Sequence, residues 1–296
     1  MHLNKQTVLF LDGQWIQAKD ARTDLFSQTL HYGNGVFEGL RAYKTPTGIT
    51  IFKAHQHFER FLSSAHKMLM NCQYSANELV DLSYELLERN QMNDAYIRPL
   101  LFNGPELSLN PANKSHLMLT AWEWGSNSVN EPFDVMISSY QKPQPKSLPV
   151  DAKVVGHYTN SILASTEARS NGYDEALLLD SRGFIAEGPA ANFFFEKNDV
   201  LFTPSIGHIL PGITRSTIID LAIEAGYEVI EKAVSVGDVL EADSAFFTST
   251  STEITGIKSI NKKTLPLKWE DSIGYSLFLM YRQKVMNNDC KVYALV

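Results

Sequence analysis

The chain contains the stretch Pro149-Val150-Asp151-Ala152-Lys153-Val154-Val155-Gly156-His157-Tyr158, in which a lysine stands directly before two valines. The valine pair indicates a strand end inside the protein, where loss of water lowers the pKa of a lysine and favours its use as a nucleophile. Most lysines in proteins are exposed, so this stretch alone does not define a site.

Two later stretches supply partners for this lysine. Glu187-Gly188-Pro189-Ala190-Ala191-Asn192 places a carboxylate at the end of an expected strand, and Leu210-Pro211-Gly212-Ile213-Thr214-Arg215 places a glycine before an expected helix. Taken singly, Glu187 reads as a surface carboxylate and Gly212 as a turn residue. Pyridoxal phosphate needs an amine for its aldehyde, a carboxylate for its ring nitrogen and backbone N–H groups for its phosphate. The order and spacing of the three stretches therefore predict a site for this cofactor.

Composition restricts the class of protein. The chain has 296 residues, 44% of them hydrophobic and 11% aromatic, which predicts roughly two globular domains. Its formal charge of −7 is spread along the sequence, which argues against nucleic-acid binding. Cys72 and Cys290 lack metal-ligand spacing, the segment 1–6 does not resemble a signal peptide, and no apolar run suits a membrane span. We therefore expect a cytoplasmic protein without a metal site.

The first half reads as an α+β unit, which we place at residues 1–124. Asp12-Gly13 predicts a two-residue hairpin, and Ser75 with Glu78 predicts a helix start with a capping box. The expected strands are 8–11, 14–16, 49–52, 95–102 and 116–124, and the expected helices are 57–69 and 75–90. Small polar residues at 125–132 predict an interdomain loop.

The second half, residues 133–296, is expected to form the larger, cofactor-binding domain. The expected strands are 133–140, 176–180, 184–187, 192–196, 200–202, 228–233 and 246–248, and the expected helices are 159–172, 213–225 and 269–286. Strands outnumber helices and rarely alternate with them one for one, which argues against a TIM barrel and against a doubly wound sheet.

Three further motifs accompany the cofactor residues. They are His31-Tyr32-Gly33-Asn34-Gly35-Val36-Phe37-Glu38-Gly39-Leu40-Arg41, Tyr96-Ile97-Arg98-Pro99-Leu100 and Glu253-Ile254-Thr255. With them, the chain resembles the branched-chain amino-acid aminotransferases of the class IV (fold type IV) pyridoxal-phosphate enzymes, in order from about Leu9 to Ile260. The resemblance implies a two-domain α+β fold. This fold would have a small N-terminal domain and a larger domain with a mixed, barrel-like sheet. The cofactor would lie between the two domains, and the protein would be a homodimer or an assembly of dimers.

The resemblance also assigns cofactor roles. Lys153 would form the aldimine and later move the proton, Glu187 would face the ring nitrogen, and Tyr158 would hydrogen-bond the phenolic oxygen. The phosphate would be held by Arg60, Ile213, Thr214 and Thr250, and Leu210 would press on one face of the ring.

The substrate residues are implied in the same way. Tyr96, Arg98 and the backbone near Thr250 and Ser251 would receive carboxylates. An apolar pocket would be formed by Phe37, Trp124 and Tyr158, with Tyr32 and Leu109 supplied by the neighbouring subunit. The implied reaction is a ping-pong transamination between L-leucine, L-isoleucine or L-valine and 2-oxoglutarate.

Other functions remain open on the sequence. A D-amino-acid aminotransferase or an aminodeoxychorismate lyase would share Lys153 and Glu187, although the pair Tyr96 and Arg98 favours the branched-chain enzymes. A non-catalytic pyridoxal-phosphate-binding protein is the alternative outside the enzymes. The chain departs from the family pattern at Asn127, where a tyrosine is usual, and at Ala191, where an acidic residue is common. These departures bear on the substrate pocket and on the hydrogen bonds around the ring.

Overall fold

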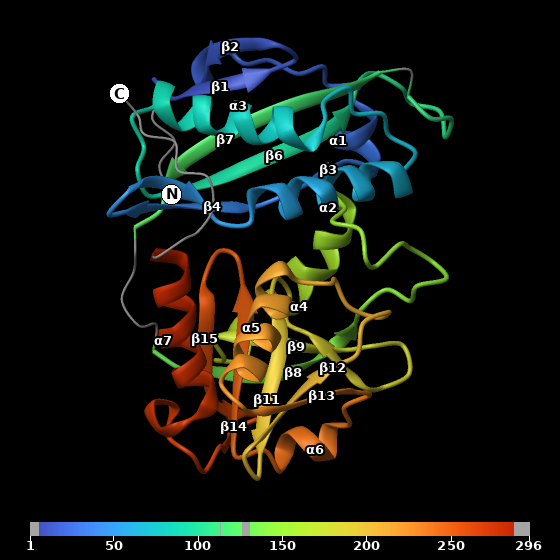
Figure 1. Ribbon diagram of the computed structural model, residues 1–296. Coiled ribbons are helices and arrows are strands. Elements are labelled where there is room, and N and C mark those ends of the chain that lie inside the picture. Colours follow the sequence, from blue (N-terminus) through green and yellow to red (C-terminus); the bar gives the residue numbers. More distant parts are fainter. Residues whose placement is uncertain (1–5, 113, 126–130, 287–296) are drawn as a thin grey trace. The chain divides into compact units, whose positions relative to one another are not determined.

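A computed structural model describes residues 6–112, 114–125 and 131–286 (Figure 1). Among these residues the chain forms two compact units. The first contains 6–125 apart from 113, together with 152–156 and 285–286, and the second contains 131–151 and 157–284. Most of the expected loop 125–132, including Asn127, lies outside the described residues, so the domain limits 1–124 and 133–296 remain a proposal.

The first unit is built on one antiparallel sheet. Its strands are β1 (Val8–Leu11), β2 (Gln14–Gln17), β3 (Val36–Phe37), β4 (Leu40–Thr45), β5 (Gly48–Ile51), β6 (Ala95–Asn103) and β7 (Ser115–Glu123). Their order is β2-β1-β7-β6-β4-β5, with β3 on β6. Asp12 and Gly13 form the expected turn between β1 and β2, with φ of 47° and 87°.

Helices cover one face of this sheet. They are α2 (Ala54–Lys67) and α3 (Ala76–Arg89), which run along the strands (Figure 1); the unit also contains the short η1 (Ala18–Asp20) and α1 (Gln28–Tyr32). The expected capping box is present, since Glu78 N–H donates to Ser75 Oγ at 3.3 Å and Ser75 N–H to Glu78 Oε2 at 2.7 Å. Phe58 and Phe61 of α2 and Leu86 of α3 are fully buried against the sheet.

The opposite face of the sheet carries polar and aromatic side chains. Tyr96 of β6 lies opposite Trp122 of β7 and Arg41 of β4, and Arg98 lies two residues further along β6. Because alternate residues of a strand share a face, these side chains point away from the buried Ile97 and its neighbours in the core.

The second unit contains a closed ring of strands. Its strands are β8 (Phe133–Gln141), β9 (Glu175–Leu179), β10 (Ile185–Glu187), β11 (Asn192–Lys197), β12 (Val200–Pro204), β13 (Glu228–Lys232), β14 (Ser244–Ser249), β15 (Glu253–Ile260) and β16 (Lys263–Thr264). They pair in the order β10-β9-β8-β15-β14-β11-β12-β13, and β11 also pairs with β10. Six strands therefore close on themselves, which confirms the barrel-like core that the family resemblance implies.

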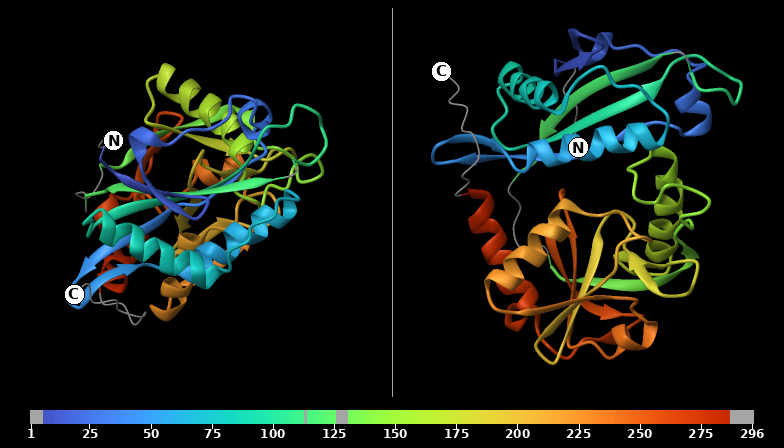
Figure 2. Two further views of the ribbon diagram at one scale, coloured as in Figure 1. Left: turned by 90° about the horizontal axis from the view of Figure 1, so that it is seen from above. Right: turned by 45° about the vertical axis from the view of Figure 1, so that its right-hand side comes forward.

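Helices pack around the outside of this barrel (Figure 2). They are α4 (Tyr158–Ser170), α5 (Ile213–Glu224), α6 (Val236–Leu240), η3 (Trp269–Asp271) and α7 (Ile273–Met286), while η2 (Val155–His157) comes directly before α4 and has its first two residues in the first unit. Small residues bring α4 close to the sheet, because Ala164 and Ala168 pack on Ala176 and Leu178 of β9. Among the described residues, no helix has both the length and the apolar character that a membrane crossing requires.

The sequence misses several elements, chiefly α1, β4, α6 and β15. Five of the six residues of β4 are buried, and seven of the eight residues of β15, so neither strand shows an alternating pattern. The helix expected at 57–69 begins at Ala54 and ends at Lys67. The helix expected at 269–286 is divided, since its first turn is η3 and α7 starts at Ile273.

Candidate active site

The segment around Lys153 is fixed along its backbone by the first unit. Lys153 N–H donates to Ser64 Oγ at 3.0 Å, and Lys153 C=O accepts from Phe37 N–H at 3.1 Å. Gly156 N–H donates to Gly33 C=O at 2.8 Å, and a Cβ on Gly33 would lie 2.8 Å from the Gly156 Cα. Two glycines thus allow the lysine segment to lie directly against the His-Tyr-Gly motif.

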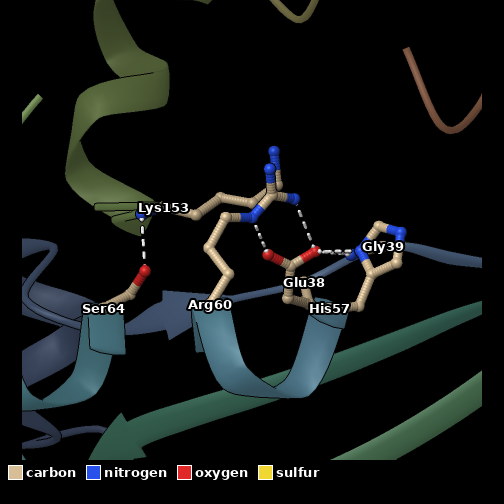
Figure 3. A network of polar contacts seen from close by, with 6 residues as sticks. All are labelled: Glu38, Gly39, His57, Arg60, Ser64 and Lys153. Atoms are coloured by element: carbon tan, nitrogen blue, oxygen red, sulfur yellow. Dashed lines mark hydrogen bonds and ion pairs between the residues drawn. The ribbon is translucent and has the colours of Figure 1, made fainter. Parts of the chain in front are cut away.

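Arg60 is held by a buried carboxylate (Figure 3). Its Nε donates to Glu38 Oε1 at 2.6 Å and its Nη2 to Glu38 Oε2 at 2.9 Å, while His57 Nδ1 lies 2.9 Å from the same Oε2. Gly39 N–H also donates to Oε2, at 3.1 Å. The Glu38 side chain is fully buried, so all of its charge is balanced by these groups.

The electrostatics of Glu38 follow from its burial and from the charged and polar groups around it. Burial alone would raise the pKa of Glu38, but the Arg60 guanidinium and the His57 hydrogen bond hold that pKa well below its usual range. Burial lowers the pKa of His57, and the charges of Arg60 and Lys153 lower it further against the opposing effect of Glu38. His57 is therefore neutral at pH 7 and donates from Nδ1 to the Glu38 carboxylate.

Arg98 is surrounded by aromatic rings. Its guanidinium carbon lies 4.7 Å from the centre of the Phe37 ring, 5.4 Å from that of Tyr96 and 5.7 Å from that of Trp122. The Tyr96 ring stacks on Trp122 at 5.0 Å and tilts against Trp124 at 5.4 Å. Arg98 Nε is buried without a hydrogen-bond partner among the described residues. A cation in apolar surroundings with an unsatisfied N–H is suited to receive an anion.

Gly39 is required beside this cluster. A Cβ at position 39 would lie 1.7 Å from the Tyr96 hydroxyl oxygen, so a side chain there would displace Tyr96. The Phe-Glu-Gly sequence therefore contributes to the positions of both arginines. Glu38 binds Arg60, Phe37 lies against Arg98, and Gly39 leaves room for the Tyr96 ring beside Arg98.

In the second unit Glu187 is a buried carboxylate with several partners. It is 4% exposed and ends β10. Its Oε2 accepts from Asn192 Nδ2 at 3.1 Å and from Leu210 N–H at 3.2 Å, and its Oε1 lies 2.8 Å from Lys142 Nζ. Asn192 Nδ2 also donates to Leu210 C=O at 2.9 Å. Three sequence segments therefore meet at this one carboxylate.

The Leu210 segment leads directly into α5. Gly212 is the residue before the helix, and a Cβ there would lie 1.9 Å from Asn192 Oδ1. Ile213 and Thr214 begin the helix, and the first N–H groups of any helix have no acceptor within it. Arg215 instead donates to Glu231 and Pro204, which ties α5 to the sheet.

Thr250 and Ser251 form the turn between β14 and β15. Ser249 Oγ lies 3.1 Å from Ser251 Oγ and accepts from Thr252 N–H at 3.1 Å, so the turn is closed by its own hydroxyls. Glu253 follows with φ of +59° and pairs with Arg282 of α7 at 2.8 Å. This pair holds the turn in a conformation that few non-glycine residues adopt.

The remaining expected residues are Tyr158, Tyr32 and Leu109. Tyr158 is the first residue of α4 and is half-buried. Tyr32 is 51% exposed and Leu109 is 91% exposed. Tyr32 hydroxyl donates to Leu107 C=O at 2.9 Å, which joins α1 to the loop that carries Leu109.

Sequence reasoning assigned no role to Glu38, His57, Ser64, Trp122 and Lys142. The spacing of Glu38 and Arg60 gives no local signal, because their side chains meet through the packing of α2 on the sheet. The available signal for this cluster is that Glu38 and His57 stand among apolar core positions.

Comparison with known proteins decides the family. The model of the amino-transferase class IV family matches residues 35–260. The chain belongs to this family. The expectation of an aminotransferase of fold type IV is therefore confirmed.

Several relatives share most of the chain. A branched-chain-amino-acid aminotransferase of Pseudomonas aeruginosa is 39% identical over 268 residues, which cover 88% of this chain and 87% of that protein. The Escherichia coli K12 enzyme of the same name is 35% identical over 269 residues, with the same coverage. A crystal structure of a branched-chain aminotransferase from Thermoproteus uzoniensis with norvaline has a TM-score of 0.91 at 34% identity, covering 96% of both chains.

One solved relative holds the cofactor. The branched-chain amino acid aminotransferase from Thermobaculum terrenum, crystallised in its PLP-form (the holo-form), has a TM-score of 0.90 at 30% identity. The match covers 96% of this chain and 95% of that one.

Proposed function

We propose that this class IV aminotransferase transfers the amino group of L-leucine, L-isoleucine or L-valine to 2-oxoglutarate, with pyridoxal phosphate as cofactor. The observation that carries the choice of substrates is Arg98, a cation among the rings of Phe37, Tyr96 and Trp122. The rings suit an aliphatic side chain, and the guanidinium suits the second carboxylate of glutamate. The relatives named above carry the same activity in their names.

The residues present fit pyridoxal phosphate. The cofactor, when bound, supplies an aldehyde that joins to amines and a ring that withdraws electrons from the carbon losing its proton. Glu187 is the buried carboxylate that such a ring nitrogen needs, and it accepts hydrogen bonds from Asn192 and from Leu210, which lies in the segment leading into α5. Thr248 of β14 lies opposite Asn192 of β11. Its hydroxyl is buried and has no hydrogen-bond partner among the described residues. These features are those of a polar site built around one carboxylate.

Lys153 would hold the aldehyde and then carry the proton. Its backbone is fixed at both its N–H and its C=O, so the position of its amine depends on side-chain rotation alone. Its Nζ lies 5.0 Å from the centre of the Phe37 ring. A fixed backbone limits the positions that the amine can reach, which suits a group that must take up and return one proton.

Glu187 would keep the ring nitrogen protonated. Lys142 now balances this carboxylate at 2.8 Å, and a cationic ring nitrogen would share it. Tyr158 would donate to the phenolic oxygen, and Leu210 would pack on a ring face. Arg60, Ile213, Thr214 and Thr250 would hold the phosphate, two of them at the start of α5, where helix N–H groups favour anions.

Tyr96 and Arg98 would receive substrate carboxylates, together with the backbone at Thr250 and Ser251, and Trp124 would complete the apolar wall. A D-amino-acid aminotransferase or a lyase shares Lys153 and Glu187 but gives no reason for Arg98 to lie among aromatic rings. The substrates are small amino acids and 2-oxo acids, and we place the enzyme in the cytoplasm.

We propose in addition that the protein is a homodimer or an assembly of dimers. The support is the exposure of apolar side chains on α1 and on the loop at 105–110, where Leu109 is 91% exposed. Also exposed are Leu30 and Tyr32 of α1, Leu107 of the loop, and Leu25 and Phe26 just before α1. A second copy would bury this surface and bring Tyr32 and Leu109 to its partner's substrate.

A single-turnover experiment tests the proposed substrates. The purified protein, loaded with pyridoxal phosphate, is mixed separately with L-leucine, D-alanine and an (R)-amine, and the visible absorption of the cofactor is followed. We expect rapid bleaching with L-leucine and little with the other two. Bleaching by D-alanine instead would contradict the branched-chain proposal and favour a D-amino-acid aminotransferase.

A further inference from the structure

Glu38 lies at the centre of a buried cluster in which only Arg60 has a role in the reaction proposed above. Four donors converge on it: Arg60 Nε and Nη2, His57 Nδ1 and Gly39 N–H, all within 3.1 Å (Figure 3). The glutamate side chain is 0% exposed, that of His57 is 2% and that of Arg60 is 13%. A carboxylate this deeply buried is costly, so its presence calls for a function beyond filling space.

The geometry fixes the orientation of one guanidinium. Glu38 binds Arg60 through both carboxylate oxygens, and a two-point contact defines the plane of the guanidinium as well as its position. His57 and Gly39 N–H in turn fix Oε2, so the carboxylate cannot rotate freely. The pair uses two of the five N–H donors of the arginine.

We infer that Glu38, itself fixed by His57, is a positioning residue that presents Arg60 to the phosphate of the cofactor. This inference rests on the proposed role of Arg60 as a phosphate ligand. A preorganised guanidinium loses less side-chain entropy when the anion binds, so its contribution to affinity is larger. Glu38 acts only through Arg60 and contacts neither the phosphate nor the substrate.

Pyridoxal, which lacks the phosphate, separates this role from two others. An effect of Glu38 on folding would weaken the binding of pyridoxal phosphate and of pyridoxal alike. An effect through Lys153 would also weaken both, because both ligands carry the aldehyde that the lysine binds. Only an effect through the phosphate changes the ratio of the two dissociation constants.

The experiment measures both dissociation constants on cofactor-depleted full-length protein, for the wild type, Arg60→Met, Glu38→Gln and the double variant. For Glu38→Gln we expect pyridoxal phosphate to bind about 10- to 100-fold more weakly, with pyridoxal changed less than about threefold. On the Arg60→Met background, Glu38→Gln should leave the ratio unchanged. His57→Gln, which keeps an N–H donor, should give an intermediate ratio.

Glu85→Gln is the matched control. Glu85 pairs with Arg89 on α3 in the same unit, but both side chains are more than 40% exposed. This variant should bind both ligands as the wild type does.

The outcomes are distinct. If Arg60→Met leaves the ratio unchanged, Arg60 is not the phosphate ligand, and the proposed role falls together with the inference. If Arg60→Met lowers the preference for pyridoxal phosphate over pyridoxal but Glu38→Gln and His57→Gln do not, the role of Arg60 stands and the inference is overturned. Should Glu38→Gln alone fail to fold, His57→Gln, which keeps both Glu38 and Arg60, gives the same decision.

Discussion

Lys153 and Phe37 are joined at two points: the Phe37 N–H donates to the Lys153 C=O at 3.1 Å, and Lys153 Nζ lies 5.0 Å from the centre of the Phe37 ring. Phe37 also lies beneath the Arg98 guanidinium, at 4.7 Å. One aromatic residue therefore contacts both the amine proposed to react and the cation proposed to select the substrate. Phe37 therefore helps to position both Lys153, the proposed proton carrier, and Arg98, the proposed receptor of the substrate carboxylate.

Lys153→Ala should abolish transamination and leave the fold intact. The change removes the amine but not the backbone hydrogen bonds to Ser64 and Phe37, so the segment stays in place. Lys142 is not expected to replace it as proton carrier, because its Nζ is paired with Glu187 at 2.8 Å. Turnover with L-leucine and the circular dichroism spectrum are measured together, with Lys146→Ala, an exposed lysine, as control. Turnover at the wild-type rate would remove Lys153 from the mechanism.

Glu187→Gln should keep the cofactor but lower kcat by orders of magnitude. The glutamine oxygen can still accept from Asn192 and Leu210, but the negative charge beside the ring nitrogen is lost. Single-turnover rates with L-leucine are compared with those of Glu224→Gln, a change at an exposed position of α5. A change below about threefold, roughly 0.7 kcal/mol in the barrier, would show that Glu187 is not the partner of the ring.

Local sequence signals predict the parts of this site that depend on local structure. The strand end at Glu187 and the helix start at Gly212 follow from turn and capping residues that lie within a few positions of one another. The pairs Glu38 with Arg60 and Lys142 with Glu187 are not predicted, because each forms between elements that only the tertiary fold brings together. The missed β4 and β15 have the same origin, since a strand buried on both faces loses its alternation.

His157 should make stability depend on pH below neutrality. Burial, with a smaller effect from the Lys142 charge, lowers the pKa of His157 to about 4. The unfolded chain titrates at about 6.5, so between these values it binds a proton that the folded protein does not. The unfolding midpoint should therefore fall as the pH is lowered from about 6.5 towards 5, before carboxylates titrate.

His157→Gln should reduce the slope of the unfolding free energy against pH. The reduction is at most the contribution of about one bound proton. His55→Gln, at a side chain that is 54% exposed, serves as the control and should retain the wild-type slope. Thermal unfolding of cofactor-depleted protein at several pH values measures both. An unchanged slope in His157→Gln would place the titrating group elsewhere.

Arg98→Ala should affect the two half-reactions unequally. One pocket must accept the aliphatic side chain of leucine and then the charged side chain of glutamate. A γ-carboxylate among the rings of Phe37, Tyr96 and Trp122 would be costly without a fixed cation. The half-reaction with L-glutamate or 2-oxoglutarate should lose roughly 2–4 kcal/mol, about 30- to 1,000-fold, while that with L-leucine changes little.

Stopped-flow measurement of each half-reaction separately decides the role of Arg98. Arg98→Lys keeps the charge but not the planar guanidinium, so it should restore part of the rate with L-glutamate. Arg89→Ala, at an arginine whose side chain is 45% exposed, is the control for loss of an arginine in the same unit. Equal losses in both half-reactions would mean that Arg98 binds the α-carboxylate common to all substrates. No loss in either would remove the structural reason for a dual-substrate pocket, because the rings of Phe37, Tyr96 and Trp122 alone explain only the aliphatic substrates.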